Sequence, residues 1–123
     1  MRRLLSAALV AGLLAAMPAA AADLPAITIR DQNDGVNSQR VVTVAAFCRG
    51  PAACTGTAKL MRGTTVLGKA PFTAQGKTTF KTPIKLSASV FRALHKARGK
   101  RMRPTLTLTQ GSRTSTHVIT IHL

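Results

Sequence analysis

Carboxylates are nearly missing from this chain of 123 residues, which has no glutamate and three aspartates, Asp23, Asp31 and Asp34. Acid–base and hydrolytic enzymes usually hold carboxylates in a cleft. The one candidate pair, Asp31 and Asp34, lies in D-Q-N-D-G (31–35), which is typical of a turn because Asn, Asp and Gly favour turn conformations. The alternative is a partial calcium loop, but its glycine falls one position too early and no later glutamate closes it.

Histidines offer little more for catalysis or metal binding. The chain has His95, His117 and His122. Five residues separate His117 from His122 on one expected strand, so they face opposite sides and cannot chelate one metal. No Gly-x-Ser-x-Gly elbow supports a serine triad. The sequence therefore predicts a protein that is not an enzyme and has no metal, no cofactor and no small-molecule substrate.

Tryptophan and tyrosine are also absent, and only four phenylalanines remain, so the core must be aliphatic. Basic residues are abundant instead: 18 Lys and Arg give a formal net charge of +15. Such a charge attracts polyanions through long-range fields. The expected partners are anionic cell-envelope polymers or lipid head groups. Nucleic acid is the weaker candidate, because single-strand binders interleave aromatic rings with their cations.

The first 22 residues have the three-part pattern of a secretory signal peptide. A basic Met1-Arg2-Arg3 precedes the apolar run 4–17, and Pro18 and Ala20–Ala22 follow with the small residues that a signal peptidase needs. The alternative is a membrane anchor, but the run of about 14 residues is shorter than the roughly 20 that span a bilayer. We therefore expect Sec-type export, cleavage after Ala22, and a secreted or cell-surface protein.

Two cysteines, Cys48 and Cys54, enclose Arg49-Gly50-Pro51-Ala52-Ala53. An even count in an exported chain favours a disulfide. The alternatives are free thiols or a metal pair, yet a redox dithiol usually has two intervening residues and nothing nearby completes a zinc site. We predict a structural disulfide.

Residues 23–123 alternate Thr, Val, Ile and Leu at period two between Gly and Pro, which is typical of strands. Lys77 to Leu86 alternates most clearly, with apolar residues on one face and lysines and Pro83 on the other, which indicates a solvated surface or a protected edge strand. The other expected strands are 25–30, 39–48, 55–62, 66–69, 71–74, 101–110 and 113–123, the last carrying Ile119, Ile121 and Leu123 on its buried face.

One segment departs from this pattern. Ser87 to Arg98 predicts a short amphipathic helix, capped by Ser87, with Val90, Phe91 and Leu94 as its apolar stripe and Gly99 at its end. Seven or eight short strands with turns about every ten residues predict an all-β, immunoglobulin-like sandwich of two sheets. We assign residues 1–22 to the signal peptide, 23–38 to a leading strand and turn, and 39–123 to the sandwich core.

Short motifs suggest a family. After Cys48 and Cys54 come T-G-T-A-K-L (55–60), L-G-K-A-P-F (67–72), Q-G-K-T-T-F (75–80), I-K-L-S (84–87) and F-R-A-L (91–94). Over residues 39–123 this order resembles the bacterial Ig-like β-sandwich modules of secreted and surface proteins from high-GC bacteria. The resemblance implies a fold and an extracellular setting. It implies no catalytic residues, because such modules are generally structural or adhesive.

A basic segment is the clearest functional signal. Its charges form a candidate polyanion patch with a second row on one strand face; the members are Arg92, Lys96, Arg98, Lys100, Arg101 and Arg103, with Lys77, Lys81 and Lys85. The alternative is a solvated face that only keeps the protein soluble. The sequence thus predicts a structural or adhesive Ig-like module, or else an electrostatic binder of anionic envelope polymers or lipid head groups.

Overall fold

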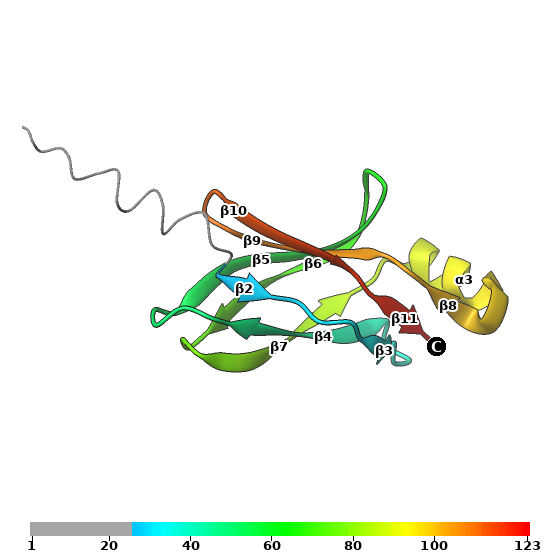
Figure 1. Ribbon diagram of the computed structural model, residues 1–123. Helices are drawn as coiled ribbons and strands as arrows, with labels where there is room; N and C mark the ends of the chain where they lie inside the picture. Colours follow the sequence, from blue (N-terminus) through cyan, green and yellow to red (C-terminus); the bar gives the residue numbers. More distant parts are fainter. Residues whose placement is uncertain (1–25) are drawn as a thin grey trace, which may run out of the picture.

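The computed structural model describes residues 26–123 (Figure 1). The signal peptide predicted over residues 1–22 lies outside the described residues. The elements are β2 (Ile27–Thr28), β3 (Asn33–Gly35), β4 (Val41–Cys48), β5 (Cys54–Arg62), β6 (Thr65–Ala74), β7 (Thr78–Lys85), α3 (Ala88–Lys96), η1 (Arg98–Lys100), β8 (Arg101–Met102), β9 (Thr105–Gln110), β10 (Arg113–Val118) and β11 (Thr120–His122).

These strands form three sheets. A four-stranded sheet has the order β10-β9-β5-β6, and a three-stranded sheet has the order β2-β4-β7. The two face each other as the layers of a sandwich, and the small sheet β3-β11-β8 lies at one end beside α3 (Figure 1). The predicted all-β sandwich with one short helix is confirmed, but the structure has a third small sheet beyond the two that were predicted.

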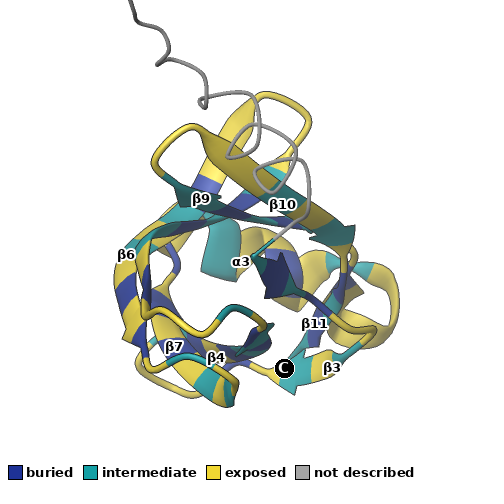
Figure 2. Cartoon of the chain, turned by 60° about the vertical axis from the view of Figure 1, so that its left-hand side comes forward, coloured by how far each residue is buried: buried dark blue, intermediate teal, exposed yellow. Residues whose placement is uncertain are grey.

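Strand alternation builds the core between the layers (Figure 2). Val42 and Val44 of β4 belong to one buried cluster with Leu106 and Leu108 of β9, and all four are at most 2% exposed. Because successive side chains of a strand point to opposite faces, the intervening residues lie outside. The predicted edge strand is also confirmed, since β7 ends its sheet and its lysines and Pro83 are exposed.

The predicted disulfide is present. Cys48 ends β4 and Cys54 begins β5, with their Cα atoms 6.0 Å apart. These strands belong to different sheets. The bond therefore joins the two layers at the point where the chain passes from one to the other.

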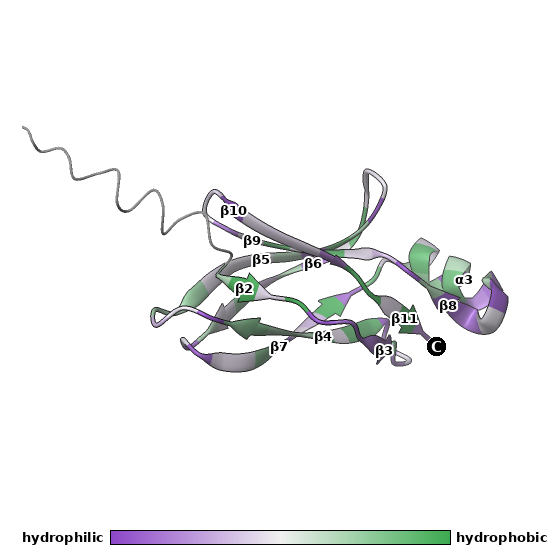
Figure 3. Cartoon of the chain, in the orientation of Figure 1, coloured by the Kyte–Doolittle hydropathy of each residue, from purple (hydrophilic) through white to green (hydrophobic). Residues whose placement is uncertain are grey.

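Helix α3 begins as predicted but ends earlier. The Ser87 side chain accepts a hydrogen bond from the backbone N–H of Val90. The helix ends at Lys96, because Ala97 is already extended. Gly99, predicted at the helix end, instead has φ 66° inside η1, a left-handed conformation that turns the chain into β8. Figure 3 shows that the connection from α3 to β8 is strongly hydrophilic.

The prediction that residues 101–110 and residues 113–123 each form one continuous strand is wrong. The first divides into β8 and β9, and the second divides into β10 and β11. In each case the two parts belong to different sheets. The breaks lie opposite each other, since the N–H of Ile119 donates to the carbonyl of Pro104 over 3.0 Å. Pro104 has no N–H for a ladder, so the pairing changes partners there. By contrast, the strands expected over 66–69 and 71–74 form one, β6.

The turn predicted at 31–35 is wrong in its second half. Asn33–Gly35 forms β3, which pairs with β11 in parallel. The N–H of Thr120 donates to the carbonyl of Gln32, and the N–H of Val36 donates to that of His122. Distant backbone pairing has therefore overridden a local turn preference.

Candidate functional site

The structure divides the predicted polyanion patch. All nine of its members are exposed. Lys81 and Lys85 lie on the outer side of β7, and Lys77 lies in the turn before it. The other six members lie on α3, η1, β8 and the residue after β8. The two rows therefore lie on different elements, and Lys85 comes two residues before the helix cap Ser87.

A hollow of about 690 Å³ gathers cations from three parts of the chain. Lys96 comes from the end of α3, Arg101 from β8, Arg103 from the residue after β8, and Arg62 from the end of β5. Ala93, Ala97 and Met102 complete its lining. We call this site the basic hollow.

Arg62 is the member of the basic hollow that sequence reasoning missed. It lies more than thirty residues before Lys96 and belongs to no basic run. It reaches the site because β5 ends beside α3, and the next hollow along, of about 270 Å³, is also lined by Arg62, with Leu67 and Val90. Only the position of Arg62 at the end of an alternating strand marks it in the sequence.

Local geometry explains why the other three cations converge. Lys96 ends α3, where positive charge complements the partial negative charge of the helix C-terminus. Gly99 then reverses the chain, and Arg101 follows in extended conformation. Arg101 and Arg103 alternate with the buried Met102, so both side chains point away from the core.

No carboxylate side chain of residues 26–123 lines the basic hollow. The only side-chain carboxylates in these residues are Asp31 and Asp34, on the segment around β3. The one ion pair found in this part of the chain joins Asp31 to His117. Four like charges in one hollow repel each other, so an anion bound there relieves that repulsion. The planar guanidinium group of arginine can also donate two parallel hydrogen bonds to a phosphate or a carboxylate.

Polar contacts join the first strands to the last ones. Asp31 contacts His117 of β10, and the Asn33 side chain contacts His122 of β11 over 2.6 Å. The prediction that both histidines share one strand is wrong, because they belong to different sheets. No group of three His, Cys, Asp or Glu in residues 26–123 could hold a metal ion. The Asp31–His117 and Asn33–His122 contacts join the N-terminal segment of the domain to its last two strands.

Asp34 is the unusual member of this region. Its Oδ2 is buried without a hydrogen-bond partner in the part of the chain described. Burial raises the pKa of the Asp34 carboxyl above its ordinary 3.8, and the positive charge of His122 partly opposes that rise. A buried carboxylate that lacks partners is costly when ionised.

We expect Asp34→Asn to gain stability relative to the original protein as pH rises. A raised folded-state pKa gives stability that is complete below 3.8 and is lost as pH rises through the folded value. The asparagine cannot ionise and escapes that loss. Because the side chain is partly solvated, the gain stays below about 1 kcal/mol. Urea midpoints measured across the acid range check it, and a difference that does not change with pH would contradict it.

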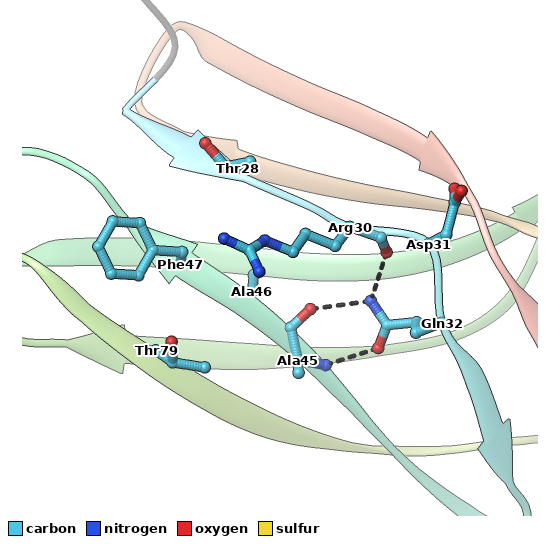
Figure 4. A pocket seen from close by; sticks show the side chains of 8 residues that line it. All are labelled: Thr28, Arg30, Asp31, Gln32, Ala45, Ala46, Phe47 and Thr79. Atoms are coloured by element: carbon cyan, nitrogen blue, oxygen red, sulfur yellow. Dashed lines mark hydrogen bonds between the residues drawn. The ribbon is translucent and has the colours of Figure 1, made fainter.

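Figure 4 shows a third hollow, of about 290 Å³, between the first segment and β4. The Gln32 side chain bridges it: its Nε2 donates to the carbonyls of Arg30 and Ala45, and its Oε1 accepts from the N–H of Ala45. The Gln32 side chain thus takes the place of backbone pairing where the segment after β2 separates from β4. These hydrogen bonds occupy the side-chain amide, so Gln32 has a structural role.

Comparison with known proteins identifies no relative. No family model matches the chain, and a search of curated proteins finds no similar sequence. Within residues 26–123, no helix is long and apolar enough to cross a membrane.

Proposed function

We propose that this chain is an exported, non-enzymatic Ig-like module that adheres to anionic molecules of the cell envelope. Strand order supports the Ig-like part. In such domains the first, second and fifth strands share one sheet, and the third, sixth and seventh form the other. The main strands follow this scheme, with β2-β4-β7 in one sheet and β5, β9 and β10 in the other. The fourth strand, β6, joins the second sheet.

The observation that carries the proposal is the basic hollow. Four cations from three chain segments line one concave surface. The only carboxylate side chains in residues 26–123 are Asp31 and Asp34, and β3, which carries Asp34, is separated from β8 by β11. Four of the 16 lysines and arginines in residues 26–123 line this one surface, where they can contact an anionic group together. Adhesion through this hollow unites the two functions that the sequence suggests.

Binding also fits the remaining polar groups better than catalysis does. The nearest approach to a triad is Ser115, His117 and Asp31. Ser115 donates its hydroxyl proton to the carbonyl of Ile27. Asp31 contacts Nε2 of His117, the nitrogen that faces the serine in a serine-protease triad. This arrangement ties strands together and leaves no activated nucleophile.

Salt-dependent retention on isolated cell envelopes tests the proposal. Exposed charges are screened beyond about 10 Å at 0.1 M salt, so we expect strong retention at low salt and release as salt rises. Soluble polyphosphate should compete for the same site. Weak retention that salt does not change would contradict the electrostatic part and leave only a passive module.

A further inference from the structure

Two large hydrophobic side chains are exposed among residues 26–123. Val66 is 45% exposed and Val118 is 44% exposed. Single exposed hydrophobic residues are common and need no explanation. These two lie far apart in the sequence, on the edge strands β6 and β10 of the same sheet. Their relation in space therefore decides whether they matter.

Strand register places both valines in one row across the sheet. Val66 pairs with Met61 of β5, Met61 pairs with Thr105 of β9, and Thr105 pairs with Val118 of β10. With strands about 4.8 Å apart, this row is about 14 Å long and crosses the whole sheet. We call Val66, Met61, Thr105 and Val118 the apolar row.

The apolar row lies on the outer face of the sheet. The neighbours of its members along the strands, Leu60, Leu67 and Leu106, are buried in the core. Because neighbouring side chains point to opposite faces, the row points outward. The connection between β5 and β6, which precedes Val66, projects from the sheets in Figure 1.

The apolar row borders the basic hollow. Arg62 follows Met61 directly at the end of β5, and by strand alternation its side chain leaves from the opposite face. Arg103 precedes Thr105 by two residues, and the buried Pro104 lies between them, so Arg103 points to the same side as the row. Cations and exposed apolar groups therefore meet at one end of the four-stranded sheet.

We propose that the anionic partner is the surface of a lipid bilayer, with the apolar row at the acyl boundary and the basic hollow over lipid phosphates. This inference rests on the proposed function and names its ligand. Interfacial binding combines buried apolar area with attraction to anionic lipids. A soluble anionic polymer satisfies the cations equally well but offers nothing to Val66 and Val118. The apolar row is the feature that distinguishes the two ligands.

The test measures binding to vesicles. The purified protein is mixed with vesicles of phosphatidylglycerol and phosphatidylcholine, with vesicles of phosphatidylcholine alone, and with polyphosphate. We expect binding to the mixed vesicles and to polyphosphate, and little to neutral vesicles. A double variant, Val66→Thr with Val118→Thr, keeps side-chain shape and strand preference. It should bind mixed vesicles roughly tenfold more weakly, a change of about 1.4 kcal/mol, and polyphosphate equally well.

A matched control removes methyl groups from the same outer face but away from the basic hollow. Thr73→Ser with Thr114→Ser changes two exposed residues on the same edge strands, β6 and β10. This control should bind both ligands like the original protein. All substituted positions are exposed, so thermal unfolding should not change, and equal unfolding midpoints show that the fold is intact.

Each outcome separates the two proposals. Binding to polyphosphate without binding to mixed vesicles overturns the lipid inference and leaves the proposed function in place. Binding to neither overturns both. Equal vesicle binding by the original protein and the double valine variant overturns the role of the apolar row. Selective loss of vesicle binding in that variant supports it.

Discussion

Replacing Arg62, Lys96, Arg101 and Arg103 together by glutamine should weaken binding to anionic envelope material by roughly a thousandfold. A Lys or Arg near an anionic surface contributes about 1 kcal/mol, so four contribute about 4 kcal/mol. All four side chains line the basic hollow and are exposed, so their loss leaves the core unchanged. The dependence of binding on salt should weaken in parallel, because fewer ions are displaced.

A second variant separates the basic hollow from overall charge. Changing Lys77, Lys81, Lys85 and Arg92 to glutamine removes the same number of charges, also from exposed positions, but none of them lines the basic hollow. We expect only a modest loss for this control. If both variants lose affinity equally, binding depends on net charge alone and the basic hollow is not a site.

The sequence predicted this site only in part, for a physical reason. The run from Arg92 to Arg103 is visible because its charges are neighbours along the chain. Arg62 is not visible, because its place in the basic hollow depends on where β5 ends relative to α3. Lys77, Lys81 and Lys85 were expected to join the patch, yet they lie on β7 and the turn before it, in a different sheet from β8, which carries Arg101. Residue type and spacing do not specify how layers face each other.

The same distinction holds for the fold. Alternation and the Ser87 cap are local signals, and both are confirmed. Parallel pairing of β3 with β11 joins residues nearly ninety positions apart and has no local signal. There the local preference of D-Q-N-D-G for a turn was misleading. Propensity decides a segment's structure only where no distant strand competes for its backbone.

Close packing between strands leads to the second large prediction: Gly56→Ala should destabilise the protein by about 3 kcal/mol, at the upper end of usual overpacking costs. A Cβ on Gly56 would lie only 1.9 Å from the carbonyl oxygen of Thr109 and 2.9 Å from its carbonyl carbon. Backbone cannot move aside as a flexible side chain does. Relief therefore requires β9 to separate from β5, which breaks hydrogen bonds between them.

Gly50→Ala is the matched control for this prediction, because it makes the same chemical change next to the disulfide. There the nearest atom to a new Cβ, the backbone nitrogen of Ala52, is 3.9 Å away, which is ordinary contact. Urea unfolding should give this variant a free energy of unfolding close to that of the original protein. If Gly56→Ala were equally harmless, β9 could not approach β5 as closely as described. Since β9 also leads back to Arg103, a shift of β9 should weaken binding at the basic hollow as well, which links the fold to the proposed function.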